Sequence, residues 1–235
     1  MQNNLDYLTF ILLSPNKYSI TVTNLKNEII FEKALKDIHM DGTKEINLYI
    51  LENFLKKNIF EIEKKLKKFI KSIYLLIDNN DIYSINFSIK NKVDIISLDT
   101  KIVNDLLVDA KSCCKDTLKN KSILHIKIDK FYIDNNYYDF FPDKKNCKNF
   151  SIDLSFICLP NDILKDIKKL LSEYQISVDK AFSYSYLKSF LNDKNKNIYE
   201  IAQKITSGHI ENEVSIIDKS PKNMGFFEKF FEFFR

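Results

Sequence analysis

Glycine is scarce in this chain of 235 residues, which contains only Gly42, Gly208 and Gly225. Loops that hold phosphate groups place glycine between a strand and a helix, because a missing side chain lets backbone N–H groups approach the anion closely. None of the three glycines lies at such a junction in the sequence pattern. No Ser/His/Asp, Cys/His or paired-carboxylate arrangement stands out either. We therefore expect no nucleotide or other cofactor and no enzymatic activity.

Cysteine and long apolar runs are also limited. No cysteine forms a C-x-x-C pair or accompanies a histidine cluster; the four are Cys113, Cys114, Cys147 and Cys158. This usage predicts reduced thiols in a cytoplasmic protein and no metal site. No segment approaches the roughly 18 apolar residues that a spanning helix needs, and no signal peptide is visible at the N-terminus.

The charges are nearly balanced, with 36 Lys and Arg against 32 Asp and Glu. The lysine-rich side of Lys56–Lys71 could bind phosphate backbones, but Glu61 and Glu63 interrupt it and it lacks the aromatic interleaving of a base-stacking surface. A solvated helix face is the favoured interpretation, so we expect no nucleic-acid partner. His125 is interpreted as a hydrogen-bonded structural residue, because no ligand pattern links it to another histidine.

Apolar periodicity predicts two α+β units followed by a tail. In the first unit, strands surround a long helix over Glu45–Lys71 whose inward positions extend to Phe69. The strands predicted there are Tyr7–Leu13, Lys17–Thr23, Glu28–Lys33, Ile73–Ile77 and Asp81–Ser88. The elements predicted in the second unit are a helix over Asp99–Thr117, strands Ile123–Ile133 and Asn149–Cys158, a helix from Pro160 to Tyr174, and a final strand Ser177–Tyr184. Weak helical patterning over residues 185–205 precedes an expected linker, Ser207–Asn223.

The last residues of the chain predict an amphipathic helix. At 100° per residue, one continuous arc is formed by Phe226, Phe227, Phe230, Phe231, Phe233 and Phe234, and charged residues fill the remainder. Twelve residues of helix are about 18 Å long, too short to span a bilayer, so such a helix would lie flat on the membrane. Lys222, just upstream, would add modest attraction to anionic lipid. A partner's groove and the protein's own core are the alternative sites for these phenylalanines.

The second unit resembles the insertion domain of FtsA, the actin-like bacterial cell-division family. The strand Leu124–Asp134 is similar to that family's "LHxIPxxFxIDG" strand, and Gln175–Asp179 is similar to its "G-L-x-V-D". The helix from Ile96 to Ala110 looks like the family's "I-T-x-x-D…A" helix. The order of elements in the first unit, together with the amphipathic C-terminus, also follows the family.

The departures from the family concern its nucleotide site. The first strand of FtsA turns at "D-x-G-S-S/T-K", where the Asp and Gly serve metal and nucleotide. Here the Asp position is Leu12 and the Gly position is Ser14. The second half of the actin fold, with its own phosphate loop and the dock for the FtsZ peptide, is unmatched. ATP binding is therefore not carried over, and FtsZ binding is doubtful.

The resemblance implies an α+β fold: a partial actin-like, ribonuclease-H-like subdomain over residues 1–90 and an insertion domain over 91–185. A helix and flexible linker over 186–222 would lead to an amphipathic membrane-targeting helix over 223–235. The implied function is a division scaffold or adaptor without ATP binding, peripheral on the inner face of the bacterial plasma membrane at the division site. Its partners would be other division proteins and copies of itself. A PilM-type pilus-assembly component and an ATP-binding filament protein are the alternatives.

Overall fold

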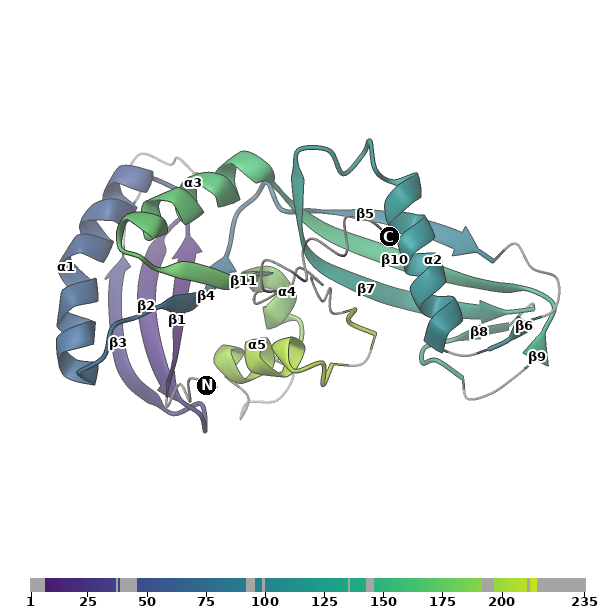
Figure 1. Ribbon diagram of the computed structural model, residues 1–235, viewed down its shortest axis with the longest axis horizontal. Helices are drawn as coiled ribbons and strands as arrows, with labels where there is room; N and C mark the ends of the chain where they lie inside the picture. Colours follow the sequence, from purple (N-terminus) through teal and green to yellow (C-terminus); the bar gives the residue numbers. More distant parts are fainter. Residues whose placement is uncertain are drawn as a thin grey trace, which may run out of the picture.

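The computed structural model describes residues 7–36, 38, 46–91, 96–98, 100–134, 136–142, 146–191, 197–210 and 212–214. Its shape is elongated, with one sheet at each end of the long axis (Figure 1). The strands β7 and β10 belong to the second sheet, and one end of each lies near the first sheet. The fold is therefore α+β, as the sequence predicts.

The first sheet has five strands in the order β11–β4–β1–β2–β3. Pairing is parallel between β11 and β4 and between β4 and β1, whereas β2 is antiparallel to both of its neighbours. The strands are β1 (Tyr7–Ser14), β2 (Lys17–Asn24), β3 (Ile29–Lys36), β4 (Ser72–Ile77) and β11 (Ser177–Ser183).

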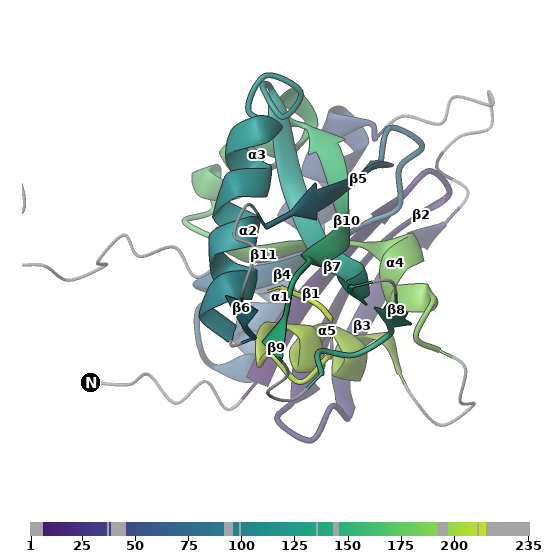
Figure 2. The same cartoon turned by 90° about the vertical axis from the view of Figure 1, so that its right-hand side faces the viewer.

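Helices cover both faces of the first sheet. Alternation along β1 sends Ile11 and Leu13 into a core with α1 (Leu48–Leu66) and α3 (Asn161–Glu173). It sends Phe10 and Leu12 into a second core on the opposite face, with α4 (Tyr184–Lys188) and α5 (Ile198–Thr206). The view along the long axis shows α4 and α5 on the side away from α3 (Figure 2). No helix in the described ranges is both long and apolar enough to cross a membrane.

The second sheet has four strands in the order β5–β10–β7–β8, with α2 (Thr100–Cys113) packed on its apolar face. The strands are β5 (Tyr83–Lys90), β7 (Lys121–Ile133), β8 (Asn136–Tyr138) and β10 (Phe150–Pro160), and the short pair β6 (Ile96–Ser97) and β9 (Asn146–Cys147) lies beside them. The core contains buried Phe150, Phe156 and Cys158. Cys158 thus packs as a small apolar residue.

A β-bulge at Leu124 connects the two cores. In the pairing with β10, Ile157 lies opposite His125 and Cys158 lies opposite Ile123, so Leu124 has no partner in that ladder. The side chain of Leu124 packs in the core with α1 and α3, whereas Ile126 packs in the second sheet's core. Because one strand contributes to both cores, the two sheets are joined by packing as well as by the chain.

The sheets divide the chain differently from the expected boundaries at 90 and 185. The predicted strand Asp81–Ser88 was grouped with the first unit, but β5 pairs with β10 in the second sheet. The predicted strand Ser177–Tyr184 was grouped with the second unit, but β11 pairs with β4, and α3 packs on the first sheet. Periodicity identifies which side chains are buried but not which sheet buries them, so both errors concern long-range pairing.

Candidate functional site

A cleft lies where the two sheets meet. Its volume is about 470 Å³, and β7 and β11 both line it, through Ile123–Ile126 and Val178–Ala181. Both walls are strand edges. β11 ends the first sheet, and the edge of β7 from Ile123 to His125 that faces away from β10 has no strand partner among the described residues. Lys168 of α3 and Thr206 of α5 close the sides.

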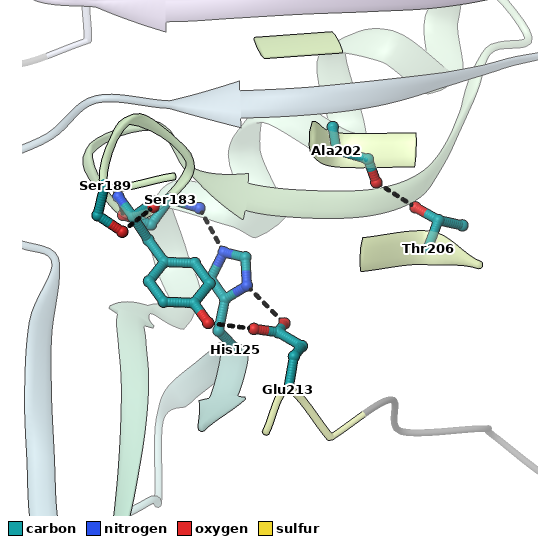
Figure 3. Close-up of polar contacts among 7 residues, drawn as sticks. His125, Ser183, Ser189, Ala202, Thr206 and Glu213 are labelled. Atoms are coloured by element: carbon teal, nitrogen blue, oxygen red, sulfur yellow. Dashed lines mark hydrogen bonds and ion pairs between the residues drawn. The ribbon is translucent and has the colours of Figure 1, made fainter. Parts of the chain in front are cut away.

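His125 fixes one end of the cleft. The backbone N–H of Ser183 donates to Nε2 of His125 at 3.0 Å, so the ring proton belongs on Nδ1. Nδ1 lies 2.8 Å from Oε1 of Glu213, to which it donates (Figure 3). The histidine and glutamate side chains are 0% and 2% exposed. The sequence-based interpretation of His125 as a hydrogen-bonded structural residue is confirmed.

Tyr186 completes this buried cluster. Its hydroxyl donates to the second carboxylate oxygen of Glu213, and its ring lies 4.3 Å from the imidazole of His125, centroid to centroid. Burial, reinforced by the nearby carboxylate, raises the pKa of Tyr186 far above its ordinary value, so the hydroxyl stays a donor. The two oxygens of Glu213 therefore each accept a hydrogen bond from a ring that is itself packed in the protein.

The cluster holds the segment Asn212–Val214 against β7. Asn212 accepts from the N–H of Ile128 at 2.8 Å, and Val214 donates to the carbonyl of Ile126 at 2.8 Å. This segment was expected to belong to a flexible linker over 186–222; that expectation is wrong for Asn212–Val214. The reason is Glu213, whose buried carboxylate gives a polar segment a specific place in the fold.

The cleft carries a partly buried positive charge. Burial lowers the pKa of Lys180, and the carboxylate of Glu213 partly offsets the effect. Asp179 faces a different partner, because its Oδ2 accepts from the hydroxyl of Ser72 at 2.6 Å. Exposed strand edges can pair with the backbone of an extended chain, and a lysine beside them can bind a negatively charged group on that chain.

The buried histidine predicts a loss of stability at low pH. Burial lowers the pKa of His125 below its ordinary value of 6.5, although Glu213 counteracts part of the shift. Below that value the unfolded chain binds a proton that the folded protein does not, so unfolding becomes easier as the pH falls. We expect the unfolding midpoint in urea to drop between about pH 7.5 and pH 5.5. His125→Phe should be less stable at both pH values and show a smaller drop; an unchanged drop would mean that other groups cause it.

The predicted membrane-binding residues lie outside the described residues, together with Lys222. They are Phe226, Phe227, Phe230, Phe231, Phe233 and Phe234. Their assignment stays a prediction. The sequence analysis missed the roles of Glu213 and Tyr186, and the only signal near them was a short apolar run beginning at Val214.

Leu12 and Ser14 lie at the end of β1, where a tight hairpin leads into β2. Leu12 is 7% exposed and packs in the core with α5. The hydroxyl of Ser14 accepts from the N–H of Lys17 at 3.1 Å within the turn. An aliphatic side chain and a closed turn thus occupy the two positions at which the resemblance would place a metal and a nucleotide. No cluster of His, Cys, Asp or Glu suited to a metal ion occurs in the described part of the chain.

The sequence matches no family model and no curated protein. Among solved structures, the chain is similar to a PilM–PilN type IV pilus biogenesis complex, at 6% identity and a TM-score of 0.48, over 85% of this chain and 51% of that chain. The cytoplasmic domain of EpsL, an inner membrane component of the type II secretion system of Vibrio cholerae, aligns at 10% identity and a TM-score of 0.36, over 75% and 57%. A Bacteroides thetaiotaomicron protein with an actin-like ATPase fold aligns at 14% identity and a TM-score of 0.30, over 79% of this chain and 55% of that chain. The chain spans little more than half the length of these structures.

The first sheet defines the class of fold. An order of β3–β2–β1–β4–β11 in which only β2 is antiparallel to its neighbours is the ribonuclease-H-like arrangement from which actin-like subdomains are built. The second sheet is inserted between β4 and α3. The chain therefore has a partial actin-like fold with an inserted α+β unit.

Proposed function

We propose that this protein is a non-enzymatic adaptor of bacterial cell division that binds an extended segment of a partner in the cleft between β7 and β11. Its C-terminal helix holds the complex on the inner face of the plasma membrane. The observation that carries the proposal is the pair of strand edges that line one cleft.

The edges favour a peptide as the occupant. Unpaired strand edges expose backbone donors and acceptors, and proteins normally cover them to prevent unwanted pairing. Here they line a cleft of about 470 Å³, whose other lining residues come from α3 and α5 as well as from Tyr74 and Val214. The buried cluster at His125 fixes the distance between the two walls, so the site is preformed and the partner alone must become ordered.

The assignment to cell division comes from the sequence. The strand Leu124–Asp134 and the phenylalanine arc of the tail are the features that resemble FtsA. The cleft is equally suited to a pilus-assembly adaptor of the PilM type, which is the second candidate function. The tail favours division, because the PilM family is not known for such a helix.

Site-specific photo-cross-linking in the native cells tests the proposal. Benzoylphenylalanine would replace Lys168 or Val178, which line the cleft, and Val108, an exposed residue of α2, as the matched control. We expect both cleft positions to give one discrete adduct that the control lacks. Identification of a division protein in that adduct supports the proposal, and a pilus or secretion protein supports the second candidate. Adducts that are the same at all three positions would contradict a binding cleft.

A further inference from the structure

A second surface of the molecule combines exposed lysines with exposed phenylalanines. It lies on the outer side of α1 and on the loop that leads to β4. Phe60 and Phe69 are 73% and 77% exposed. Among the exposed large hydrophobic residues of the described part, only Tyr49, also at 73%, reaches these values. We call the following residues the basic–aromatic surface: Lys56, Lys57, Phe60, Lys64, Lys67, Lys68, Phe69 and Lys71.

Phe69 points outward because the helix ends earlier than its pattern predicts. The helix was expected to continue to Lys71 with Phe69 inward, but Lys67 adopts a left-handed conformation (φ 53°) and its N–H donates to the carbonyl of Glu63. The carboxylate of Glu63 then accepts from the N–H of Ile70 at 3.0 Å, and Ile70 occupies the core. The hydroxyl of Tyr7 donates to the carbonyl of Phe69 at 3.1 Å. Backbone contacts on both sides thus present the Phe69 ring to solvent.

The surface is positively charged. The segment Leu48–Ser72 has seven lysines and three glutamates, an excess equal to the +4 of the whole chain. Two of those glutamates are already engaged, because Glu61 pairs with Lys33 at 3.2 Å and Glu63 holds the loop. Within the described ranges, none of Lys56, Lys57, Lys64, Lys67 and Lys71 forms an ion pair. With all three glutamates counted, the segment still carries a net positive charge.

We infer that the basic–aromatic surface binds the headgroup region of an anionic lipid membrane. Lys56, Phe60 and Lys64 follow one another at steps of four residues, so they lie along one side of α1, and Lys67 follows at the end of the helix. Lysines near an anionic bilayer are each attracted to it, and an exposed phenylalanine can enter the boundary between headgroups and acyl chains. Nucleic acid fits less well, because single strands are bound in grooves with stacking platforms, and this surface is the convex side of a helix and a loop.

This inference goes beyond the proposed function and needs neither the cleft nor the tail. Its test uses the full chain carrying Phe230→Glu and Phe231→Glu, which removes the tail's apolar arc from the measurement. Sedimentation with vesicles of phosphatidylcholine containing about 30% phosphatidylglycerol should show residual binding that weakens as salt is raised. Adding Lys64→Glu, Lys67→Glu and Phe69→Ser should weaken that binding at least about tenfold, because each lysine near the surface contributes several-fold in affinity.

A matched control changes equivalent residues elsewhere. Lys115→Glu, Lys119→Glu and Phe140→Ser alter exposed lysines and an exposed phenylalanine of the second unit, and vesicle binding should stay within about twofold. Equal losses in the two triple variants would overturn the inference in favour of net charge alone. Absence of residual vesicle binding would overturn it as well. So would a result in which the surface variant binds vesicles normally but loses binding to single-stranded nucleic acid. The proposed function survives each of these results, since the cleft and the tail are tested separately.

Discussion

Replacing Glu213 by alanine is expected to lower the free energy of unfolding by about 3 kcal/mol. The substitution leaves Nδ1–H of His125 and the hydroxyl of Tyr186 without acceptors in a site where the two side chains of the His125–Glu213 pair are 0% and 2% exposed. It should also loosen Asn212–Val214 from β7, because the segment would keep its two backbone hydrogen bonds, the bond from Asn212 to Asp139 and the packing of Val214, but lose its buried carboxylate anchor. Urea unfolding measures the first effect, and faster amide exchange at Val214 measures the second.

Two controls make this prediction specific. Glu213→Gln keeps an oxygen that can accept from His125 and an amide that can donate to Tyr186, so its loss should be clearly smaller. Glu200→Ala removes the partly exposed partner of Lys204, a contact of 2.7 Å along α5, and should cost no more than about 0.5 kcal/mol. If Glu213→Ala lowers the free energy of unfolding no more than Glu200→Ala does, the buried cluster does not hold Asn212–Val214 in place.

The second large effect is expected in the tail. Replacing Phe230 and Phe231 by glutamate should reduce binding to phosphatidylcholine vesicles more than about 100-fold, because each buried phenylalanine contributes roughly 1.5–3 kcal/mol and each new carboxylate resists transfer into the bilayer. The intact arc of six phenylalanines offers on the order of 10 kcal/mol before the cost of ordering the helix is subtracted. Vesicle flotation with the purified full chain measures the change.

Phe230→Leu with Phe231→Leu is the matched control for the tail. It keeps two apolar side chains on the same arc, so most of the binding should remain. Equal losses in the glutamate and leucine pairs would point to a partner that recognises aromatic rings rather than to a membrane. No loss in either pair would leave the phenylalanines without a role in membrane binding.

Local patterns in the sequence predict most of the individual elements. Alternation of apolar residues locates β1, β2, β7 and β10 to within about three residues, because each of these strands buries one or both faces completely. The end of α1 was predicted four to five residues too late, since Phe69 continues the apolar period although Lys67 ends the helix through a backbone contact. The short strands β6, β8 and β9 were missed, because two or three residues establish no period.

Long-range relations could not be predicted in the same way. The pairing of β11 with β4 joins residues more than 100 positions apart, and nothing in either strand distinguishes this partner from a strand of the second sheet. Glu213 presented a similar problem. In the sequence it is one glutamate in a polar stretch, and only the fold brings it under His125, 88 positions away. Predicting such a site requires knowing which elements converge, which periodicity does not reveal.

The central claim is that this protein acts as a membrane-held adaptor in cell division, and fluorescence localisation in the native cells tests it most directly. A fluorescent protein would be fused to the N-terminus of the full chain, with and without Phe230→Glu and Phe231→Glu. The account predicts a membrane-associated band at mid-cell for the natural sequence and diffuse or much weaker fluorescence for the double variant. Diffuse fluorescence of the natural sequence, or a band that is unchanged in the variant, would contradict it.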